Sequence, residues 1–446
     1  MTEIDSLPIL TAAASFEQQR RVAGSLTARG LTAGDRIAFL VSNHPLTISA
    51  VLGALRIGVI PVMLDPALSE NERADVLADA DCALIIESHE SLQELNLGEP
   101  IDIASAPLGR PMHYTSGTTG RRKGVWSGVL SEAAGAALVA EERDQWSLRS
   151  NDIHLVVSGL YHSAPLRFPS GTLLAGGSVA VLPHFSGDAF LAALRDVQPT
   201  TIFCSPAHLQ RLTETIDAGA TLPDVSQVRL LAHAGAPCAR PLKERIHGLF
   251  PSGSVWEFYG ATEGQFTVCP PDEWASHPGS VGRVRPGREL SVDPDGTIWC
   301  RVPDYARFSY WGDSAKTAAA WRGDAFSVGD LGRLDSDGYL YLDGRRDDLI
   351  ISGGVNVYPR EVELAFEGCP GIGEIAVFAR PDDRWGQRVC AVVTGNATDD
   401  ELRNWAEIHL SAARRPKEYH RLPAIPHSGI GKVRRRFLAA ELGLEE

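Results

Sequence analysis

The chain has 446 residues, with 42 lysines and arginines against 56 aspartates and glutamates, and a formal net charge of −14. This length is roughly three times that of a ~150-residue domain, so two or three domains, or a large domain with a smaller one, are expected. An acidic chain repels nucleic acid and anionic lipid, and no apolar run reaches about 18 residues, so a nucleic-acid partner and a membrane span are both disfavoured.

The cysteines and the first residues favour the cytoplasm. The seven cysteines are an odd number, and no two have the Cys-x-x-Cys spacing of a zinc site. Buried thiols in a reducing compartment are the simplest interpretation, so neither a disulfide framework nor zinc is predicted. The segment 1–5 is acidic and lacks the basic start of a signal peptide. A soluble, cytoplasmic protein is therefore expected.

The first two thirds of the chain alternate helix-like and strand-like segments. Apolar residues recur at helical spacing over 16–29, 45–58 and 70–80. Short apolar runs predict strands over 36–41, 59–64, 82–86, 178–182, 201–204, 228–233 and 255–259. Strands separated by helices of about 10–15 residues form βαβ units with a parallel sheet. The predicted fold class is therefore α/β, with parallel sheets flanked by helices.

The pattern changes after about residue 275. Short β segments are predicted between 289 and 303, and a hairpin over 335–343 with its turn at Asp337-Gly338. The remainder mixes helices over 359–367 and 399–411 with strands over 374–378 and 389–394. This mixture is typical of a small α+β domain at the C-terminal end.

The segment 114–124, Tyr-Thr-Ser-Gly-Thr-Thr-Gly-Arg-Arg-Lys-Gly, concentrates hydroxyls and glycines. Glycines let backbone N–H groups turn toward an anion, hydroxyls donate to phosphate oxygens, and lysine adds positive charge. It is not a Walker A loop, because Arg122 and Gly124 stand where that loop needs glycine and serine or threonine. The segment predicts a phosphate-binding loop whose candidate ligands are Thr115, Ser116, Gly117, Thr118, Thr119, Gly120 and Lys123.

This loop resembles the phosphate loop of the adenylate-forming superfamily, which includes acyl-CoA synthetases, luciferases and the adenylation domains of peptide synthetases. Four further segments resemble motifs of that family in the same order: 259–263, 329–330, 344–354 and 426–433. The chain is therefore identified as a short member of this family. The resemblance implies an N-terminal AMP-binding domain over 1–346 that includes a small β-rich part, and a mobile lid over 347–446 with its hinge at Asp347.

The resemblance also implies a nucleotide site. Thr262 would donate to the α-phosphate of ATP, and Glu263 would bind Mg²⁺, which prefers hard oxygen ligands. Asp330 would accept hydrogen bonds from the ribose hydroxyls, and Arg345 would add a second contact. Tyr259 would lie against the adenine. The other nucleotide-binding candidates are Gly235, Ala236, Pro237, Glu257, Phe258, Gly260 and Ala261.

Lys432 is the expected catalytic cation. Activation of an acid brings its carboxylate onto the α-phosphate, so negative charge accumulates on phosphate oxygens in the transition state. A preorganised cation stabilises that charge. Thr262, Glu263 and His162 complete the predicted catalytic set.

The acid pocket is expected around His162, where amino-acid-activating relatives carry an aspartate. An α-amino acid is therefore disfavoured as the substrate. A purely structural histidine is the alternative interpretation of His162. The predicted lining residues are Tyr161, His162, His233, Ala234, Gly235 and Gly260.

A second set of residues resembles the CoA-binding segments of aryl-CoA ligases: Gly353, Gly354, Trp385, Arg415 and Lys417. The basic pair can equally be solvated surface. Ala413 stands where an aromatic residue often stacks on the CoA adenine, which weakens the CoA assignment. Arg122 and Ile430 also replace residues common in the family, a proline and a small polar residue.

The predicted enzyme is an AMP-forming acid–thiol ligase of the acyl-CoA synthetase type. With ATP and Mg²⁺ it would convert an aryl, cinnamic-type or fatty acid to acyl-AMP and pyrophosphate, and then transfer the acyl group to CoA. Three alternatives share the adenylation step: loading of a carrier protein, amide formation with an amine, and nitrite activation for diazotisation. The sequence names neither the acid nor the oligomeric state.

Overall fold

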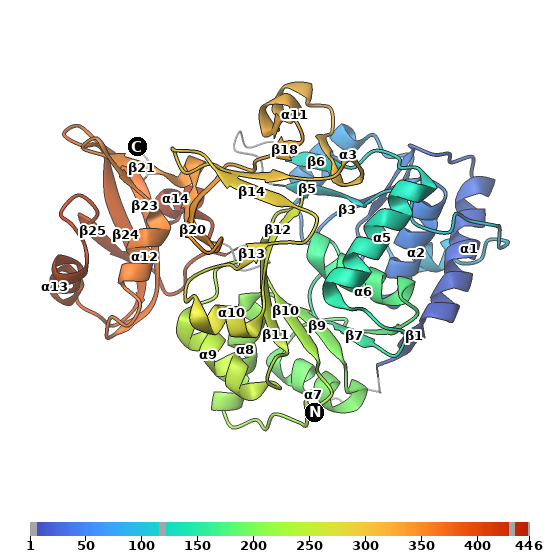
Figure 1. Cartoon of the computed structure of the whole chain (residues 1–446), viewed down its shortest axis with the longest axis horizontal. Coiled ribbons are helices and arrows are strands. Elements are labelled where there is room, and N and C mark those ends of the chain that lie inside the picture. The colour runs from blue at the N-terminus through green and yellow to red at the C-terminus, as the bar shows by residue number, and fades with distance from the viewer. Residues whose placement is uncertain (1–6, 116–121, 428–432, 445–446) are drawn as a thin grey trace. The chain divides into compact units, whose positions relative to one another are not determined.

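The computed structural model describes residues 7–115, 122–427 and 433–444. Contacts within the chain divide it into two units (Figure 1). The first unit contains residues 1–289 and 300–326, and the second contains residues 290–299 and 327–446. The domain boundary and hinge expected at Asp347 stay a prediction.

The larger sheet of the first unit has eight strands in the order β1-β8-β7-β9-β10-β11-β12-β13. The five strands from β8 to β11 run parallel, whereas β1, β12 and β13 pair antiparallel at the two edges. Figure 1 shows β7, β9, β10 and β11 side by side. The strands are Ile9–Thr11 (β1), Ile153–Val156 (β7), Ser178–Val181 (β8), Thr201–Cys204 (β9), Leu230–His233 (β10), Val255–Gly260 (β11), Gln265–Cys269 (β12) and Arg283–Val284 (β13).

The second sheet of this unit has the order β16-β6-β5-β3-β2-β4. Strands β5 and β6 form an antiparallel pair in which Thr115 lies opposite Lys123, so the predicted phosphate loop connects two neighbouring strands. The strands are Arg36–Phe39 (β2), Ile60–Met63 (β3), Leu84–Ile86 (β4), Met112–Thr115 (β5), Lys123–Trp126 (β6) and Ser309–Tyr310 (β16).

Helices connect the parallel strands, because a parallel crossover needs a dozen or more residues. Helix α3 begins where Ser69 and Glu72 form a capping box, which satisfies N–H groups that the first turn leaves free. The helices are Ala12–Ala28 (α1), Pro45–Arg56 (α2), Glu70–Ala80 (α3), His89–Leu95 (α4), Glu132–Trp146 (α5), Ser163–Leu174 (α6), Gly187–Val197 (α7), Pro206–Asp217 (α8), Arg240–Leu249 (α9), Pro271–Ser276 (α10) and Ser314–Ala320 (α11). The predicted α/β class with helix-flanked parallel sheets is confirmed.

Short β segments follow the larger sheet. Glu289–Val292 (β14) and Ile298–Arg301 (β15) lie in the predicted range of 289–303. Trp321–Arg322 (β17) and Ala325–Phe326 (β18) were not predicted, and a 3₁₀ turn lies at Asp304–Ala306. None of the helices in the part of the chain that the structure describes is both long and apolar enough to cross a membrane.

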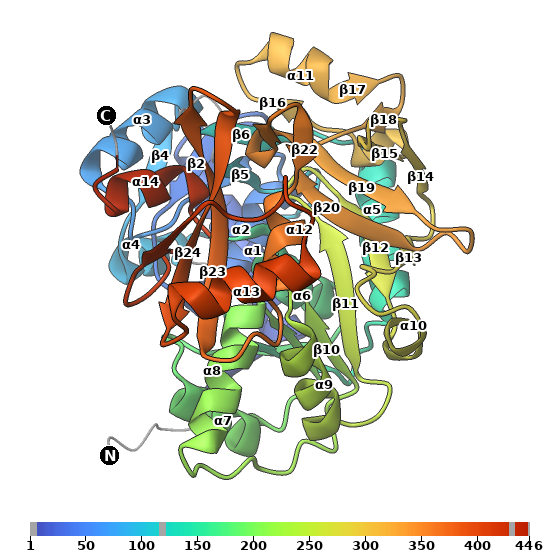
Figure 2. The same cartoon turned by 90° about the vertical axis from the view of Figure 1, so that its left-hand side faces the viewer.

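The second unit contains the predicted hairpin and a mixed sheet. The hairpin turn lies at 335–339 as expected, but its strands extend further, to Asp330–Leu334 (β19) and Leu340–Arg345 (β20). The sheet has the order β22-β21-β24-β23, with β25 also pairing with β24, and α13 lies against β23 and β24 (Figure 2). Its elements are Ile350–Ser352 (β21), Val355–Val357 (β22), Pro359–Ala365 (α12), Ile372–Asp382 (β23), Gly386–Gly395 (β24), Asp399–His409 (α13), Glu418–Arg421 (β25) and Leu438–Glu441 (α14). Two 3₁₀ turns complete it, Arg346–Asp348 and Arg435–Phe437.

Candidate active site

Ion pairs anchor the strand that follows the predicted phosphate loop. The Nζ of Lys123 lies 3.8 Å from carboxylate oxygens of both Asp79 and Asp313. Arg122 donates to Glu72 on α3 over 2.7 Å, and this bond, with the one from Ser69, lowers the pKa of Glu72 to about 2. Arg122 therefore makes an anchoring contact that proline could not make. The loop residues Ser116, Gly117, Thr118, Thr119 and Gly120 lie outside the described residues.

A tight turn joins β11 to β12 and carries the predicted α-phosphate and magnesium ligands. Ala261 and Gly264 exchange backbone hydrogen bonds of 2.8 and 3.2 Å, which leaves Thr262 and Glu263 at the tip. A Cβ on Gly260 would lie 2.9 Å from both the Cα of Gln265 and the carbonyl oxygen of Gly264, so this position requires glycine. The turn therefore fixes both candidate ligands against the end of the sheet.

The carboxylate of Glu263 suits a magnesium ion. Its side chain is buried, and Tyr310 donates a 2.8 Å hydrogen bond to Oε1, which orients the group. A carboxylate is the kind of hard oxygen ligand that Mg²⁺ prefers when it also holds phosphates. Glu263 thus fits the predicted metal role.

The side chains of Phe258 and Tyr259, two further nucleotide-binding candidates on β11, lie in different surroundings. The ring of Phe258 packs among Trp146, Phe168 and Phe203, at centroid distances of 5.5, 6.1 and 5.9 Å. Its side chain therefore belongs to an aromatic core, and only its backbone can face a ligand. The half-exposed Tyr259 lies 4.9 Å from the Phe266 ring.

Glu257 faces the opposite side of the sheet and forms a buried ion pair. Its carboxylate accepts a hydrogen bond from Lys243 on α9, whose exposed fraction is 2 %. The same Nζ lies 4.7 Å above the Trp274 ring. The ion pair commits the Glu257 side chain to the protein interior.

His233, at the end of β10, is a buried neutral imidazole. It is fully buried, and neither ring nitrogen has a hydrogen-bond partner among the described residues. Burial holds the pKa of His233 well below its usual value, and the nearby charge of Lys243 and the ring of His247 lower it further. Ala234 and Gly235 follow directly, and Gly235 adopts a φ of +98°, which favours glycine. Ala236 is half-buried and Pro237 is exposed.

His162 precedes α6, and its ring lies beside that of Tyr161, with centroids 4.4 Å apart and the planes tilted by 51°. His162 occupies the N-cap position of α6, but its side chain makes no capping hydrogen bond to the helix. The Tyr161 carbonyl hydrogen bonds with His113 Nδ1 over 3.0 Å. Burial lowers the pKa of His113 to about 4, so that ring is neutral.

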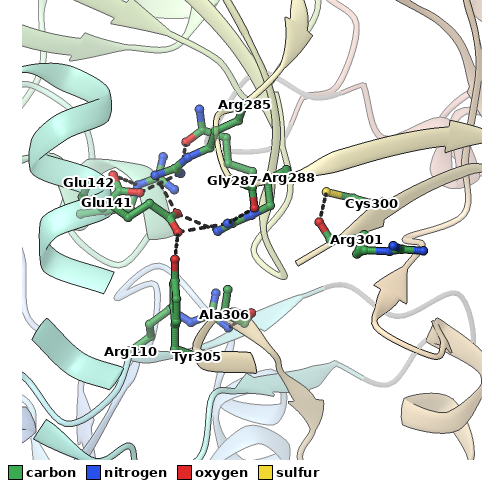
Figure 3. A network of polar contacts seen from close by, with 12 residues as sticks. Arg110, Glu141, Glu142, Arg285, Gly287, Arg288, Cys300, Arg301, Tyr305 and Ala306 are labelled. Atoms are coloured by element: carbon green, nitrogen blue, oxygen red, sulfur yellow. Dashed lines mark hydrogen bonds and ion pairs between the residues drawn. The ribbon is translucent and has the colours of Figure 1, made fainter. Parts of the chain in front are cut away.

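A cavity of about 160 Å³ lies between α2, α5, α6 and the Tyr259–Glu263 turn, entirely within the first unit. Its lining combines an apolar wall with a cluster of charged side chains, and Ala261 and Thr262 reach it from the turn. The charged residues are Arg110, Glu141, Glu142, Arg167, Arg285 and Arg288. None of the six predicted acid-pocket residues is among the described residues that line it. Figure 3 shows Glu141 between Arg288 and Tyr305.

Sequence reasoning missed this cluster. Its six charged residues come from a loop before β5, from α5, from α6 and from the segment after β13. No spacing in the sequence joins these segments, so only the fold brings them together.

In the second unit, Asp330 and Arg345 lie opposite each other in the hairpin. The Nε of Arg345 is 3.1 Å from Asp330 Oδ1, so the two predicted ribose ligands form an ion pair. Asp347 lies in the 3₁₀ turn that follows. Lys432 lies outside the described residues.

Three of the predicted CoA-binding residues, Gly353, Trp385 and Lys417, lie close together. Gly353 has a φ of +58°, and a Cβ there would lie 2.7 Å from the Trp385 ring, so only glycine fits against this half-exposed indole. Lys417 lies 6.0 Å above the same ring and donates to the Ala412 carbonyl. Arg415 instead donates to the carbonyls of Leu410 and Glu407. Gly354 also has a positive φ, with open space where a Cβ would stand.

Two family models match the chain. Residues 8–106 and 111–304 match the model described as AMP-binding enzyme, and residues 361–432 match that described as AMP-binding enzyme C-terminal domain. These matches span the segments that carry most of the predicted site.

Individual relatives match over nearly the whole chain. A feruloyl-CoA synthase from Amycolatopsis sp. is 32% identical, with 96% of this chain and 94% of that protein covered. A 2-succinylbenzoate–CoA ligase from Listeria monocytogenes serotype 4b is 29% identical, with 95% and 92% covered. Among solved structures, the o-succinylbenzoate CoA synthetase from Bacillus subtilis in complex with its acyl-adenylate intermediate superposes with a TM-score of 0.84, at 26% identity, over 96% of this chain and 93% of that one.

Proposed function

The chain belongs to the AMP-binding enzyme family, and from that membership we propose which of its residues perform the reaction and which acid it takes. The predicted resemblance to the adenylate-forming superfamily is confirmed. The protein is an AMP-forming acid–thiol ligase that uses ATP and Mg²⁺ to activate a carboxylic acid as acyl-AMP and then transfers the acyl group to CoA.

The Tyr259–Glu263 turn carries the proposal for the adenylation step. Thr262 donates to the α-phosphate and Glu263 holds Mg²⁺, whose charge neutralises phosphate oxygens. Support comes from the geometry of the turn, which holds both side chains at its tip, and from the Tyr310 hydrogen bond that orients the Glu263 carboxylate. Lys123 adds positive charge at the start of β6.

Residues from the hairpin, β11 and the C-terminal end are proposed to bind the rest of the nucleotide. Asp330 accepts hydrogen bonds from the ribose hydroxyls, with Arg345 beside it. Tyr259 contacts the adenine. Lys432 stabilises the charge that develops on the α-phosphate as the acid's carboxylate attacks. Support for Asp330 and Arg345 is their ion pair across the hairpin.

Gly353, Gly354, Trp385 and Lys417 are proposed to bind CoA. The close approach of Gly353 to the Trp385 ring and the cation above that ring support this assignment. Arg415 has less support, because its Nε and Nη2 atoms donate to the end of α13 and to the turn after it.

We further propose an aryl acid as the substrate. The relatives are named for acids with an aromatic ring, 2-succinylbenzoate and ferulate. The cavity beside Thr262 offers leucine and valine side chains that suit such a ring. His162 is proposed to line the entrance to the acid site, whereas the fully buried His233, whose neighbours include Lys243 on α9, is assigned a structural role. A cytoplasmic location is also proposed, and it is supported by the seven cysteines, which are all free thiols.

Acid-dependent release of pyrophosphate tests this function. The purified protein with Mg·ATP is expected to release pyrophosphate with substituted benzoic or cinnamic acids, and to lose this activity when EDTA removes Mg²⁺. Addition of free CoA is expected to yield the acyl-CoA, which mass spectrometry detects. Parallel reactions contain a holo-carrier protein, an amine, or nitrite with an arylamine. A product from one of these and none from CoA contradicts the acceptor, and absence of pyrophosphate with every acid contradicts the adenylation.

Asp347→Pro tests the proposed hinge. Proline fixes φ near −65°, which a 3₁₀ turn accommodates, so the variant is expected to fold. A hinge residue must absorb a change in φ/ψ between two states, which proline prevents. Acyl-AMP formation is therefore expected to stay within a few-fold of the parent, whereas thioester formation from a supplied acyl-AMP falls by at least about 10-fold. Asp347→Ala, the matched control, should retain both steps. Equal rates of both steps in Asp347→Pro and the parent would show that the lid does not pivot there.

A further inference from the structure

Positively charged side chains outnumber negatively charged ones around the cavity. Arg110, Arg167, Arg285 and Arg288 line it, whereas among the residues that the structure describes only Glu141 and Glu142 contribute carboxylates to the lining. The lining therefore carries a formal charge of +2. An uncompensated charge inside a protein is costly, so a site built this way favours a ligand that brings negative charge.

The carboxylates of Glu141 and Glu142 pair mainly with Arg285 and Arg288. Glu141 takes Arg288 in a bidentate pair, with contacts of 2.7 and 3.0 Å, and it also accepts from Tyr305. Arg285 lies 2.9 Å from Glu141 and 2.8 Å from Glu142. These contacts hold Arg285 and Arg288 in place and consume most of the acceptor capacity of the pair.

The positive charges of Arg110 and Arg167 are less well neutralised by nearby carboxylates. Arg110 donates to the carbonyls of Glu263, Ala306 and Arg307. Burial and the like charges of Arg167 and Arg288 lower the pKa of Arg110 to about 10, although the carboxylates of Glu263 and Glu141 oppose this shift. The Nε of Arg167 lies 3.4 Å from Glu142, without hydrogen-bond geometry. Burial lowers the pKa of Arg167 as well, although its neighbouring glutamates oppose this.

Buried donors in the cluster also lack acceptors. The Nε and Nη2 atoms of Arg167 and the Nε atom of Arg285 are shielded from solvent and have no hydrogen-bond partner among the described residues, whereas Nη2 of Arg285 lies in the ion pair with Glu141. Arg285 is 2 % exposed. An unsatisfied buried donor is destabilising unless a ligand or water accepts from it, and a carboxylate accepts two parallel bonds from an arginine fork.

The rest of the cavity fits the body of a small acid. Its apolar wall comes from Leu52 and Leu55 on α2, Leu138 and Val139 on α5, and Leu166 on α6. The volume of about 160 Å³ is close to that of an apolar cavity of about 150 Å³ that holds one benzene ring. Thr262, proposed to contact the α-phosphate, reaches the same cavity.

We propose that this cavity selects an aromatic acid with a second carboxylate, about one ring in size, and that Arg167 binds that second carboxylate. The first carboxylate then faces Thr262, where adenylation occurs, and the ring lies along the leucines. Because the assignment rests on the proposed function, it must be tested with a readout that does not depend on turnover as well as with one that does.

The test compares acids that differ only in the distal charge. The three benzene dicarboxylic acids are each paired with the monomethyl ester, which keeps the shape and removes one charge. The parent is expected to show a kcat/KM for pyrophosphate release about 10- to 100-fold higher for the best diacid than for its half-ester, the effect of one or two charge-assisted hydrogen bonds. In Arg167→Met the preference is expected to fall to within about 3-fold of unity, because only the diacid loses a contact.

Controls separate this role from a structural one. Arg143→Met removes an exposed arginine from the same region, on α5, and should keep the preference of the parent. Arg167→Gln is the second variant, for use if Arg167→Met does not fold. A parent that favours the half-ester, or a preference that survives removal of Arg167, overturns the proposal while leaving the adenylation chemistry intact.

Thermal unfolding supplies the independent readout. Each diacid and half-ester is added to the parent and to Arg167→Met without ATP. A rise in Tm with a diacid alone, seen in the parent and lost in the variant, supports the site even if no acid releases pyrophosphate and the proposed function fails. If no diacid raises the parent's Tm more than its half-ester does, the site assignment is wrong.

Discussion

Lys432→Ala is expected to reduce acyl-AMP formation by about 10²–10³-fold or more, while a supplied acyl-AMP is still converted to the thioester at a near-parental rate. The lysine is proposed to act where charge develops on the α-phosphate, and loss of one such preorganised donor commonly has an effect of this size. Thioester formation breaks the acyl–phosphate bond after the adenylate exists, so it does not need this cation at the attacking carboxylate. The two half-reactions are measured separately, by pyrophosphate exchange and by mass spectrometry of the thioester.

Arg434→Ala is the matched control, because it removes a cation two positions away that lies 4.5 Å above the Phe437 ring. It should leave both half-reactions within about 3-fold of the parent. A Lys432→Ala variant that forms acyl-AMP at a near-parental rate would remove Lys432 from the catalytic set. Loss of both half-reactions together would instead indicate a folding defect, which circular dichroism checks.

Lys243→Met is expected to lower the free energy of unfolding by about 3–5 kcal/mol, the usual effect of removing one partner of a buried ion pair. The pair with Glu257 is almost completely buried, and the variant leaves that carboxylate inside the protein without its cation. Methionine keeps most of the side-chain volume, so a cavity contributes little. Denaturant unfolding of parent and variant, compared at equal m-values, measures the difference.

Two further variants identify the cause. Lys243→Met combined with Glu257→Gln removes the stranded charge and should recover more than half of the lost stability. Arg245 lies on the same helix as Lys243, α9, but forms its ion pair with Asp217 at the surface. Arg245→Met should therefore lower the free energy of unfolding by less than about 1 kcal/mol. Equal effects of Lys243→Met and Arg245→Met would show that burial does not govern the pair. Failure of the double variant to recover stability would assign the loss to packing against Trp274 instead.

The local structure was largely predictable, because it depends on neighbouring residues. Helix α3 occupies Glu70–Ala80 as expected, since Ser69 and Glu72 mark its start. Strand β9 occupies Thr201–Cys204, also as expected, because three consecutive apolar residues follow a threonine, and Pro199 and Pro206 lie just outside this run. The order of the strands was not predictable. Strand β1 lies beside β8, about 170 residues away, and nothing in the local sequence of either strand encodes that neighbour.

In the candidate site, too, features formed by consecutive residues were predictable, and those that depend on the fold were not. The Tyr259–Glu263 turn could be recognised because its residues are consecutive. The burial of Phe258 and Glu257 could not, since it depends on which helix covers each face of β11. The arginine cluster was missed for a stronger reason: Arg110 and Arg288 are separated by most of the first unit and meet only around the cavity.

The position of Arg167 has a consequence for how substrate preference can evolve. It stands on α6, whereas the proposed α-phosphate and magnesium ligands, Thr262 and Glu263, stand on the turn after β11. Under the proposed role of Arg167, a point mutation on α6 alters the acid that is accepted without replacing the residues proposed to activate it. Duplicated copies of such a gene would then diverge toward new acids through single changes on this helix, while Thr262 and Glu263 stay unchanged.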